Sequence, residues 1–464
     1  MTTVARALEL AEAGQLRSVS ALQDLVRIRS LTGEEGEGAA HVASMLRGIG
    51  AEVELAEPDI ARMFELFPAV AQYPTHWQHD LILPYSELPT LAALRESGLE
   101  PVLNYRGRPN VTGMLRGSGG GRSLVINGHI DTVTVEPADR WTFDPFGAEI
   151  RDGKMYGRGT SDMKGGLNAA LMALSFIREA GIRLRGDVIV QCVVNEEHAG
   201  NGTLDLVCRG SRADAAIVLE PTSNTISVSH PGGLYWQITV PGVPRSPGAR
   251  WQGATLDGVS AIEKLPALIA ALLALETRFN AVAASPDGQP PFSLVMGKIA
   301  GGHYETVTAG ELLLKGGAYF APEVGTVGEV MQAFRDAVRS ANETDPQLRA
   351  GPARLEFLHH DDSTDQPGDI EIARVLGHVL HSRGGDGRPH RGHFCCDMRH
   401  LVNQGGMPAV IFGPGTIAQA HKPDEYIPVD DYLQAISHLI AFICTWCDGE
   451  PGSARPAPSR DISA

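Results

Sequence analysis

The sequence predicts an α/β protein in which a mixed sheet with helices on both faces is interrupted by a smaller α+β unit with a four-stranded sheet. Three observations support this fold class. A chain of 464 residues is long for one domain and suggests two, each with its own core. Apolar strand-like stretches alternate with helical ones over 1–221 and again over 360–449. Between them, over 222–359, paired strands are followed by a long helix, a pattern typical of an antiparallel sheet.

Composition and charge limit the possible partners. Hydrophobic residues make up 43% and charged residues 20%, as in ordinary soluble proteins, and the formal net charge is −16. Without a basic run, this charge argues against nucleic acid and anionic membranes as partners. Residues 1–27 carry charges throughout and predict an amphipathic helix with no export signal, and no stretch reaches the roughly 20 apolar residues of a membrane span. Six cysteines without disulfide-framework spacing complete the expectation of a cytoplasmic protein.

The first part begins with helix, loop, helix and strand over 18–55. The segment 57–105 has scattered prolines and many aromatic residues, and it predicts an insertion of short helices packed on the core. Its aromatic side chains can also wall a pocket, but plain packing is the favoured interpretation. The segment holds Phe64, Phe67, Tyr73, Trp77, His79 and Tyr85.

A histidine and several acidic residues follow the buried strands of the first part. "LVINGHIDTV" and "GDVIVQCVVNEEHAG" read as strands that end in polar residues, as does "ADAAIVLEPT", while "YGRGTSDMKGG" is a glycine-rich turn that opens an apolar helix. Side chains at the carboxyl ends of strands in an open α/β sheet converge in one crevice. The residues at these positions are His129, Asp131, Asp162, Glu196, Glu197 and Glu220.

This set of side chains predicts a metal site. Carboxylates packed together raise each other's pKa unless a cation neutralises them. Imidazole and carboxylate without cysteine suit zinc, or a similar divalent ion such as cobalt or manganese. Two such ions about 3.5–4 Å apart, bridged by one carboxylate, polarise a carbonyl and lower the pKa of bound water. Glu196, adjacent to Glu197, is then free to act as a base. One strand-end acid alone is more often a solvated or capping group, but the whole constellation favours metal.

The middle part, 222–359, predicts two helices on a four-stranded, mostly antiparallel sheet. Its strand-like stretches are "TISVS", "LYWQITV", "FSLVMGKIAGG", "ELLLKGGAYFA" and "ARLEFLHH". After residue 360 the chain returns to helix and strand, and the loop "AQAHKPDEYIP" presents His421. The motif "CTWC" lies in the last apolar helix, so packed thiols are favoured over redox or zinc chemistry. Residues 450–464 are rich in Pro, Ser and Gly and predict a disordered tail.

Six motifs in this order resemble a known enzyme family. "NGHIDTV", "GRGTSDMKGG", "NEEHAG", "LEPT", "GPG" and "AHKPDEYIP" are similar to those of the dinuclear-zinc metallopeptidases and deacylases, which include acetylornithine deacetylase, succinyl-diaminopimelate desuccinylase, aminoacylases and glutamate carboxypeptidases. The resemblance implies a catalytic domain formed by the first and last parts and a lid formed by 222–359, which commonly makes a homodimer. Closure of the lid would complete the site and exclude water.

The resemblance also implies roles for single residues. Asp162 would bridge two zinc ions, the first held also by His129 and Glu220 and the second by Glu197 and His421. Asp131 would hydrogen-bond the far nitrogen of His129 and fix its orientation. Glu196 would take a proton from the water between the metals and pass it to the leaving amine.

Two departures from the family pattern concern the substrate. Many members have a lid histidine that reaches the scissile carbonyl oxygen, and this sequence has Ser246 at that position, with His230 or His303 as candidate substitutes. Members that bind a substrate carboxylate often have an arginine where this sequence has Tyr319. The substrate therefore lacks the usual carboxylate, is more aromatic, or is held by Arg399 or Arg245, the former in a segment that also matches the family.

The sequence therefore predicts a metal-dependent hydrolase of a linear amide C–N bond, acting on a small N-acylated molecule. An N-acyl amino acid deacylase similar to acetylornithine deacetylase is the favoured interpretation. Alternatives are a dipeptidase or carboxypeptidase, a hydrolytic deaminase or amidase on an aromatic substrate, and, from another class, a catalytically silent dimeric binding module. The intact candidate base Glu196 and the full set of ligands argue against the last of these.

Overall fold

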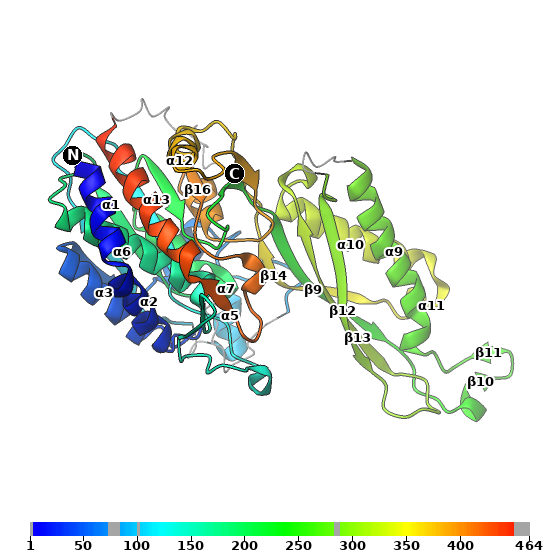
Figure 1. Cartoon of the computed structure of the whole chain (residues 1–464). Helices are drawn as coiled ribbons and strands as arrows, with labels where there is room; N and C mark the ends of the chain where they lie inside the picture. The colour runs from blue at the N-terminus through cyan, green and yellow to red at the C-terminus, as the bar shows by residue number, and fades with distance from the viewer. Residues whose placement is uncertain (1–2, 73–83, 100–102, 283–287, 450–464) are drawn as a thin grey trace.

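A computed structural model describes residues 3–72, 84–99, 103–282 and 288–449, and it confirms the predicted fold class. Figure 1 shows a large sheet with helices on both faces and a smaller unit of sheet and helices that extends from it. The smaller unit lies between two stretches of chain that both belong to the larger one. The tail predicted over 450–464 lies outside the described residues.

The large sheet is mixed and has eight strands in the order β1-β2-β6-β3-β7-β16-β8-β15. Its centre is parallel, because β3 pairs in parallel with both β6 and β7, and β16 pairs in parallel with β7. The carboxyl ends of these strands therefore meet at one edge. The strands are β1 (Glu52–Ala56), β2 (Asn110–Leu115), β3 (Leu124–His129), β6 (Val188–Val193), β7 (Ala215–Val218), β8 (Ile226–Ser229), β15 (Pro389–Arg391) and β16 (Ala409–Ile411).

Successive residues of β3 point to opposite faces, as the period of a strand requires. Leu124 and Ile126 pack in the core beneath one layer of helices, whereas Val125 packs in a second core on the other face. The first face carries α1 (Thr3–Ala13), α2 (Gln15–Arg27), α3 (Gly36–Ile49), α6 (Gly165–Glu179), α12 (Glu371–Ser382) and α13 (Val429–Asp448). The second carries η6 (His400–Gln404) and α8 (Asn201–Cys208), and α8 contributes residues to both cores.

The smaller unit is an antiparallel sheet in the order β12-β13-β9-β14 with two long helices, as predicted. Trp236, Phe292 and Phe334 form the centre of its core. Its elements are β9 (Gly232–Pro241), α9 (Ala261–Val282), β12 (Phe292–Gly301), β13 (Glu311–Phe320), α10 (Val327–Thr344), α11 (Pro346–Ala350) and β14 (Arg354–Asp361), with the short β10 (Trp251–Gln252) and β11 (Thr255–Leu256) at its tip.

The assignment of "TISVS" to the smaller unit is wrong. This stretch forms β8, which pairs with β15 and β16 at the edge of the large sheet. The alternating pattern of its residues predicts a strand but carries no information about which sheet the strand joins. The smaller sheet begins only with β9.

The described parts of 57–105 contain α4 (Ile60–Leu66), α5 (Leu91–Leu94) and η1 (Arg95–Leu99). Phe64 is buried and Phe67 packs against the cores, whereas Tyr73, Trp77 and His79 lie outside the described residues. Tyr85 binds the smaller unit, because its backbone exchanges hydrogen bonds of 2.9 and 2.7 Å with Phe357 of β14. This segment therefore ties the large domain to the base of the smaller one.

His360 of β14 also joins the two units, and it does so as a neutral imidazole that contacts Tyr85 and Ala69. Its Nε2 donates to the carbonyl of Ala69 at 3.0 Å, so its Nδ1, 2.6 Å from the Tyr85 hydroxyl, accepts from it. Burial lowers the pKa of His360 to about 4 from an ordinary 6.5.

We expect the folded protein to lose stability through His360 as the pH falls from 6.5 to 4. In this window the unfolded chain binds a proton that the folded chain does not, which costs about 3 kcal/mol at the lower end. Thermal unfolding midpoints measured across this range should fall less for His360→Gln than for the wild type. His378→Gln, at an exposed position of α12, is the control, and equal slopes for all three proteins would contradict the prediction.

No helix among the described residues is long and apolar enough to cross a membrane. All six cysteines lie in the described part of the chain, and they are free thiols. Cys444 and Cys447 are buried in α13, and burial raises the pKa of the Cys444 thiol to about 12.

Candidate active site

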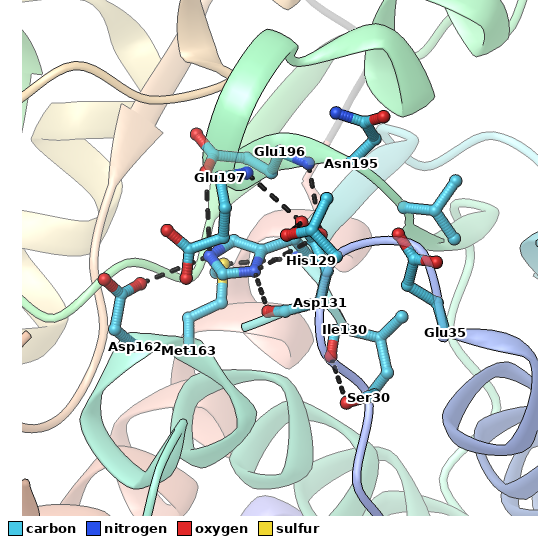
Figure 2. Close-up of polar contacts among 12 residues, drawn as sticks. Ser30, Glu35, His129, Ile130, Asp131, Asp162, Met163, Asn195, Glu196 and Glu197 are labelled. Carbon is cyan, nitrogen blue, oxygen red and sulfur yellow. Dashed lines mark hydrogen bonds and ion pairs between the residues drawn. The ribbon is translucent and has the colours of Figure 1, made fainter. Parts of the chain in front are cut away.

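The predicted cluster forms at the carboxyl edge of the large sheet (Figure 2). His129 is the last residue of β3, and Glu220 follows β7 by two residues. Glu196 and Glu197 open the short helix α7 (Glu196–Ala199) after β6. Because β6, β3 and β7 are parallel neighbours, these three strand ends converge.

Two further residues reach the cluster from loops. Asp162 lies in η3 (Thr160–Lys164), directly before α6, and His421 lies in the loop before β17 (Tyr426–Pro428). The strand β17 pairs with β5 (Lys154–Tyr156), which itself pairs with β4 (Glu149–Arg151). This small sheet brings the His421 loop beside the Asp162 turn, although the two are far apart in sequence.

Asp162 lies between the two histidines. Its Oδ1 is 3.2 Å from His129 Nε2, and its Oδ2 is 3.2 Å from His421 Nε2. His421 Nε2 is also 2.9 Å from Glu197 Oε2, and His129 Nε2 is 3.8 Å from Glu220 Oε1. Asp162 is therefore the residue that links two groups of donor atoms.

The predicted bond from the Asp131 carboxylate to His129 is wrong. His129 Nδ1 instead lies 2.8 Å from the backbone carbonyl of Asp131, and the nearer Asp131 carboxylate oxygen is 3.8 Å away. A carbonyl can only accept, so Nδ1 carries a proton, and Nε2 is the ring nitrogen that faces the cluster. Asp131 thus orients His129 through its main chain.

The Asp131 carboxylate has another role. It accepts hydrogen bonds from the backbone amides of Glu196 at 3.1 Å and Glu197 at 3.3 Å, and from the hydroxyl of Thr32 at 2.9 Å. Asp131 is fully buried, and these three donors replace the water that its charge would otherwise bind. Asp131 therefore holds the turn that presents the two glutamates.

The electrostatics of the cluster fit bound cations. Burial raises the pKa of Glu196 and of Glu220 well above the ordinary value, and neighbouring carboxylates add to both shifts. Burial acts in the same direction on Asp162, but hydrogen bonds from His129 and His421 outweigh it and lower its pKa. Buried carboxylates at such spacing are stable together only when positive charge neutralises them. Donor atoms of His129, Glu196 and Glu220 lie within 4.8 Å of one another, as do those of His129, Asp162 and Glu197, so the residues fit divalent metal ions.

A buried ion pair that the sequence did not reveal holds the Asp162 turn. Glu425 Oε1 accepts from the backbone amides of Ser161 at 3.0 Å and Asp162 at 3.1 Å, while its Oε2 lies 2.6 Å from Arg158 Nη1. The side chains of Glu425 and Arg158 are each 1% exposed. The two residues stand in motifs that the sequence analysis quoted, but 267 positions separate them, and nothing in the local pattern indicates that they pair.

A cavity of about 810 Å³ opens over the cluster, between the large sheet and the smaller unit. Asp162, Glu196, Glu197, Glu220 and His421 line one side. The other side is formed by the smaller sheet and the loop that follows β15, and it includes Tyr235, Tyr319, His359, Cys395 and Arg399. The smaller unit is thus placed as a lid over the cluster.

The four predicted substrate contacts divide into two pairs. Tyr319 and Arg399 line the cavity, but Arg399 is buried and lies 3.0 Å from Asp361, which neutralises its charge. His230 lies outside the cavity lining, buried with its Nδ1 2.8 Å from the carbonyl of Pro231. Ser246 is also absent from the lining and stands at the start of a short 3-10 helix that contacts β10.

Three other residues named from the sequence can be placed. Arg245 lies beside Ser246 and forms an ion pair with Asp257, while His303 lines a separate hollow at the tip of the smaller unit. Cys395, expected near the site, does line the cavity, and its thiol donates to the carbonyl of Pro231. Neither Arg245 nor His303 belongs to the cavity over the cluster in this chain.

His359, Asp361 and Tyr235 also line the cavity, although the sequence did not predict them there. His359 Nε2 lies 2.6 Å from Asp361 Oδ2, and the His359 ring lies 5.3 Å from that of Tyr235. They stand on β14 and β9, whose pairing places Tyr235 opposite His359. The stretch "LHHDD" could have indicated them, because its histidines and acids lie at the end of a strand. The candidate metal ligands of the first part also lie at strand ends.

The site combines a cluster of candidate metal ligands, one further carboxylate, Glu196, and a lid that covers both. This combination is typical of a metal-dependent hydrolase. Residues 125–445 match the profile of peptidase family M20/M25/M40, and the chain belongs to this family of hydrolases, which act on amide C–N bonds. A Bacillus subtilis relative, N-formyl-4-amino-5-aminomethyl-2-methylpyrimidine deformylase, is 32% identical over 74% of this chain and 84% of its own length. The acetylornithine deacetylase of Myxococcus xanthus is 28% identical over 77% of this chain and 87% of its own.

Solved structures show the same fold. The dipeptidase Dug1p of Saccharomyces cerevisiae superposes with a TM-score of 0.70 at 12% identity, over 97% of this chain and 100% of its own. A tripeptidase of Staphylococcus aureus superposes with a TM-score of 0.66 at 19% identity, over 93% and 98%. At these identities the likeness concerns the fold alone.

Proposed function

We propose that this protein hydrolyses an amide between a small acyl group and an amine, with Glu196 as the general base. The observation that carries the proposal is the position of Glu196. Its carboxylate faces the cavity, 3.9 Å from His129 Nε2, and its backbone is fixed by Asp131. A raised pKa suits a carboxyl group that must take up a proton and release it again during one turnover.

We infer that two divalent ions, zinc with cobalt or manganese as alternatives, complete this site. The residues proposed as ligands are His129, Asp162, Glu197, Glu220 and His421, with Asp162 shared between the ions. When bound, such ions polarise the amide carbonyl and acidify the attacking water. Glu196 accepts the proton that this water loses and donates it to the amide nitrogen as the C–N bond breaks. The products are a carboxylic acid and a free amine.

The lid wall of the cavity favours a flat aromatic amine over an amino acid. Tyr235 and Tyr319 share a hydrogen bond, and each ring lies across a glycine of the neighbouring strand. A Cβ at Gly317 would lie 3.1 Å from the Tyr235 ring, and one at Gly233 would lie 3.3 Å from the Tyr319 ring. The two rings therefore give this wall an aromatic surface, which suits stacking.

Among the described residues that line it, the cavity offers a substrate carboxylate no arginine that is free of an ion pair. Arg399 is already paired with Asp361. Lys298 and Lys315 are the two lysines of the lining, and neither offers the bidentate fork of arginine. The name of the Bacillus subtilis relative points the same way, since its amine half is an aminomethylpyrimidine. We therefore place an N-formyl arylmethylamine ahead of an N-acyl amino acid, and a dipeptide last.

The test is a panel of N-formyl and N-acetyl arylmethylamines, N-acetylornithine and dipeptides, with formate, acetate or amine release as the readout. We expect the highest kcat/KM for an N-formyl arylmethylamine, and full loss of release with a chelator. Higher kcat/KM for N-acetylornithine would restore the N-acyl amino acid interpretation. Cleavage of the dipeptides alone would move the protein to the peptidases.

Replacing Tyr319 by leucine should raise KM for the aromatic substrate about tenfold with little change in kcat. A stacking contact of about 1 kcal/mol or slightly more is lost, and a contact that is equally strong in the bound substrate and in the transition state changes KM and leaves kcat unchanged. Steady-state kinetics of Tyr319→Leu and Tyr319→Arg on the panel measure this, with Tyr304→Leu, 66% exposed at the lid tip, as control. An unchanged KM for the leucine variant would remove Tyr319 from the substrate site.

We also propose that the protein is a homodimer formed through the lid. The outer strand β12 and the adjacent helix α9 leave large apolar side chains exposed. Unpaired edges with apolar residues favour association. The exposed residues are Val295 and Ile299 on β12 and Ile262 and Leu273 on α9. The mass of the protein in solution, by light scattering, decides between monomer and dimer.

A further inference from the structure

The residue that precedes the candidate base has an unusual conformation. Asn195 has φ 61° and ψ 30°, the left-handed region that residues other than glycine seldom occupy. It lies between β6 and α7, directly before Glu196, so its conformation sets the direction in which Glu196 leaves the turn. Such a conformation persists where the surroundings hold it in place.

Arg108 binds the side chain of Asn195, whose backbone carbonyl also accepts from the amides of Ala199 and Gly200. Its Nη2 donates to Asn195 Oδ1 at 3.1 Å. The same guanidinium donates through Nε and Nη2 to both oxygens of Glu35 at 2.7 Å each, a bidentate pair. The side chain of Arg108 is 8% exposed and that of Glu35 is fully buried. Glu35 therefore fixes Arg108, and Arg108 presents one nitrogen to Asn195.

Two contacts from one N-terminal loop thus meet at the same turn. Thr32 donates to the Asp131 carboxylate, which binds the backbone amides of Glu196 and Glu197. Glu35, three residues later, acts through Arg108 on the side chain of Asn195. Figure 2 shows Glu35 and Asn195 on the side of Asp131 away from Asp162. The first contact fixes the main chain after the turn, and the second fixes the turn itself.

A buried ion pair is a costly way to obtain stability alone. Desolvation of the two charges offsets most of their attraction, and well-packed apolar residues often serve as well. Arginine offers what an apolar pair cannot, a rigid fork with a further donor at a fixed angle. That further donor is directed at the residue next to Glu196.

We propose that Glu35 and Arg108 are positioning residues that hold Asn195 in its left-handed conformation and so aim the Glu196 carboxylate. The inference rests on the proposed function of Glu196. Neither residue lines the cavity, so both act on turnover rather than on substrate binding.

The test variant is Glu35→Leu combined with Arg108→Met, which removes both charges and avoids an unpaired buried ion. We expect kcat to fall at least tenfold, with KM changed less than threefold and the metal content unchanged. Amide hydrogen exchange in a peptide covering 194–200 should become faster in the same variant. This second readout does not depend on activity.

The control is the pair Arg122→Met and Glu371→Leu. Arg122 is equally buried, is paired with Glu371 and stacks on Trp446, in α13. The Glu371 side chain is 47% exposed, so this control should lower the unfolding temperature no more than the test variant does, with kcat and the exchange of 194–200 as in the wild type. Arg108→Met is also made in an Asn195→Gly background, where the target of the arginine is gone. In the Asn195→Gly background, Arg108→Met should lower kcat less than twofold.

The outcomes separate the two proposals. An active wild type with unchanged kcat and exchange in the Glu35→Leu, Arg108→Met variant overturns the positioning role alone. The positioning role is also overturned if Arg108→Met lowers kcat by the same factor in the wild-type and Asn195→Gly backgrounds. The effect of Arg108 would then not depend on the Asn195 side chain. A wild type that binds metal but cleaves no amide overturns the proposed function, while the exchange measurement still decides whether Arg108 and Glu35 hold the turn.

Discussion

Glu196→Gln is expected to bind metal as the wild type does and to lose about 10²- to 10⁴-fold in kcat, the usual contribution of a general base. Glutamine has nearly the same shape, and the backbone bond from residue 196 to Asp131 stays in place. The amide cannot accept a proton from the attacking water or deliver one to the leaving amine. The measurement is kcat on the best substrate of the panel, together with metal content by elemental analysis.

The matched control is Glu149→Gln, the same chemical change on an exposed residue of β4. It should keep wild-type kcat and metal content. Near-wild-type turnover by Glu196→Gln would exclude Glu196 as the base. A loss of metal in that variant would instead make Glu196 a ligand, since its carboxylate lies within reach of His129 and Glu220.

The fold could be predicted from the sequence because its strands and helices have clear periods. "LVINGHIDTV" begins with three consecutive apolar residues, which is typical of a central parallel strand, and β3 is buried along its whole length. The alternation of residue types along a strand does not indicate which sheet the strand joins. The assignment of β8 to the smaller unit was therefore wrong. Nor could it show that Tyr85 pairs with β14, because this contact joins positions more than 270 residues apart.

The candidate cluster could be predicted for a similar reason. His129, Glu196 and Glu220 stand at strand ends, and parallel strands bring their ends together whatever the rest of the chain does. The supporting contacts follow no such rule. The Nδ1 partner of His129 depends on the path of the main chain, and a carbonyl two residues away took the place expected for a carboxylate. Glu425 is paired across the fold, and such pairs become visible only in three dimensions.

Asp162→Asn is the second change for which we expect a large effect, a loss of bound metal and of all measurable turnover. Asp162 is the residue whose two oxygens face different histidines, 3.2 Å from His129 and 3.2 Å from His421. Asparagine keeps one carbonyl oxygen but places an amide NH₂ group, which has no lone pair for a cation, on the other side. One change therefore weakens both halves of the cluster and removes one negative charge.

The matched control is Asp386→Asn, at a surface carboxylate paired with Arg388, and it should keep both metal and activity. The comparison also separates metal binding from folding. The turn that carries residue 162 is held through its backbone by Glu425 and Arg158, which the substitution leaves intact, so the variant should fold. A folded variant with wild-type metal content and turnover would show that Asp162 does not join the two groups of ligands. A folded variant with about half of the metal and no turnover would show that one group holds its ion without Asp162, and that catalysis needs both.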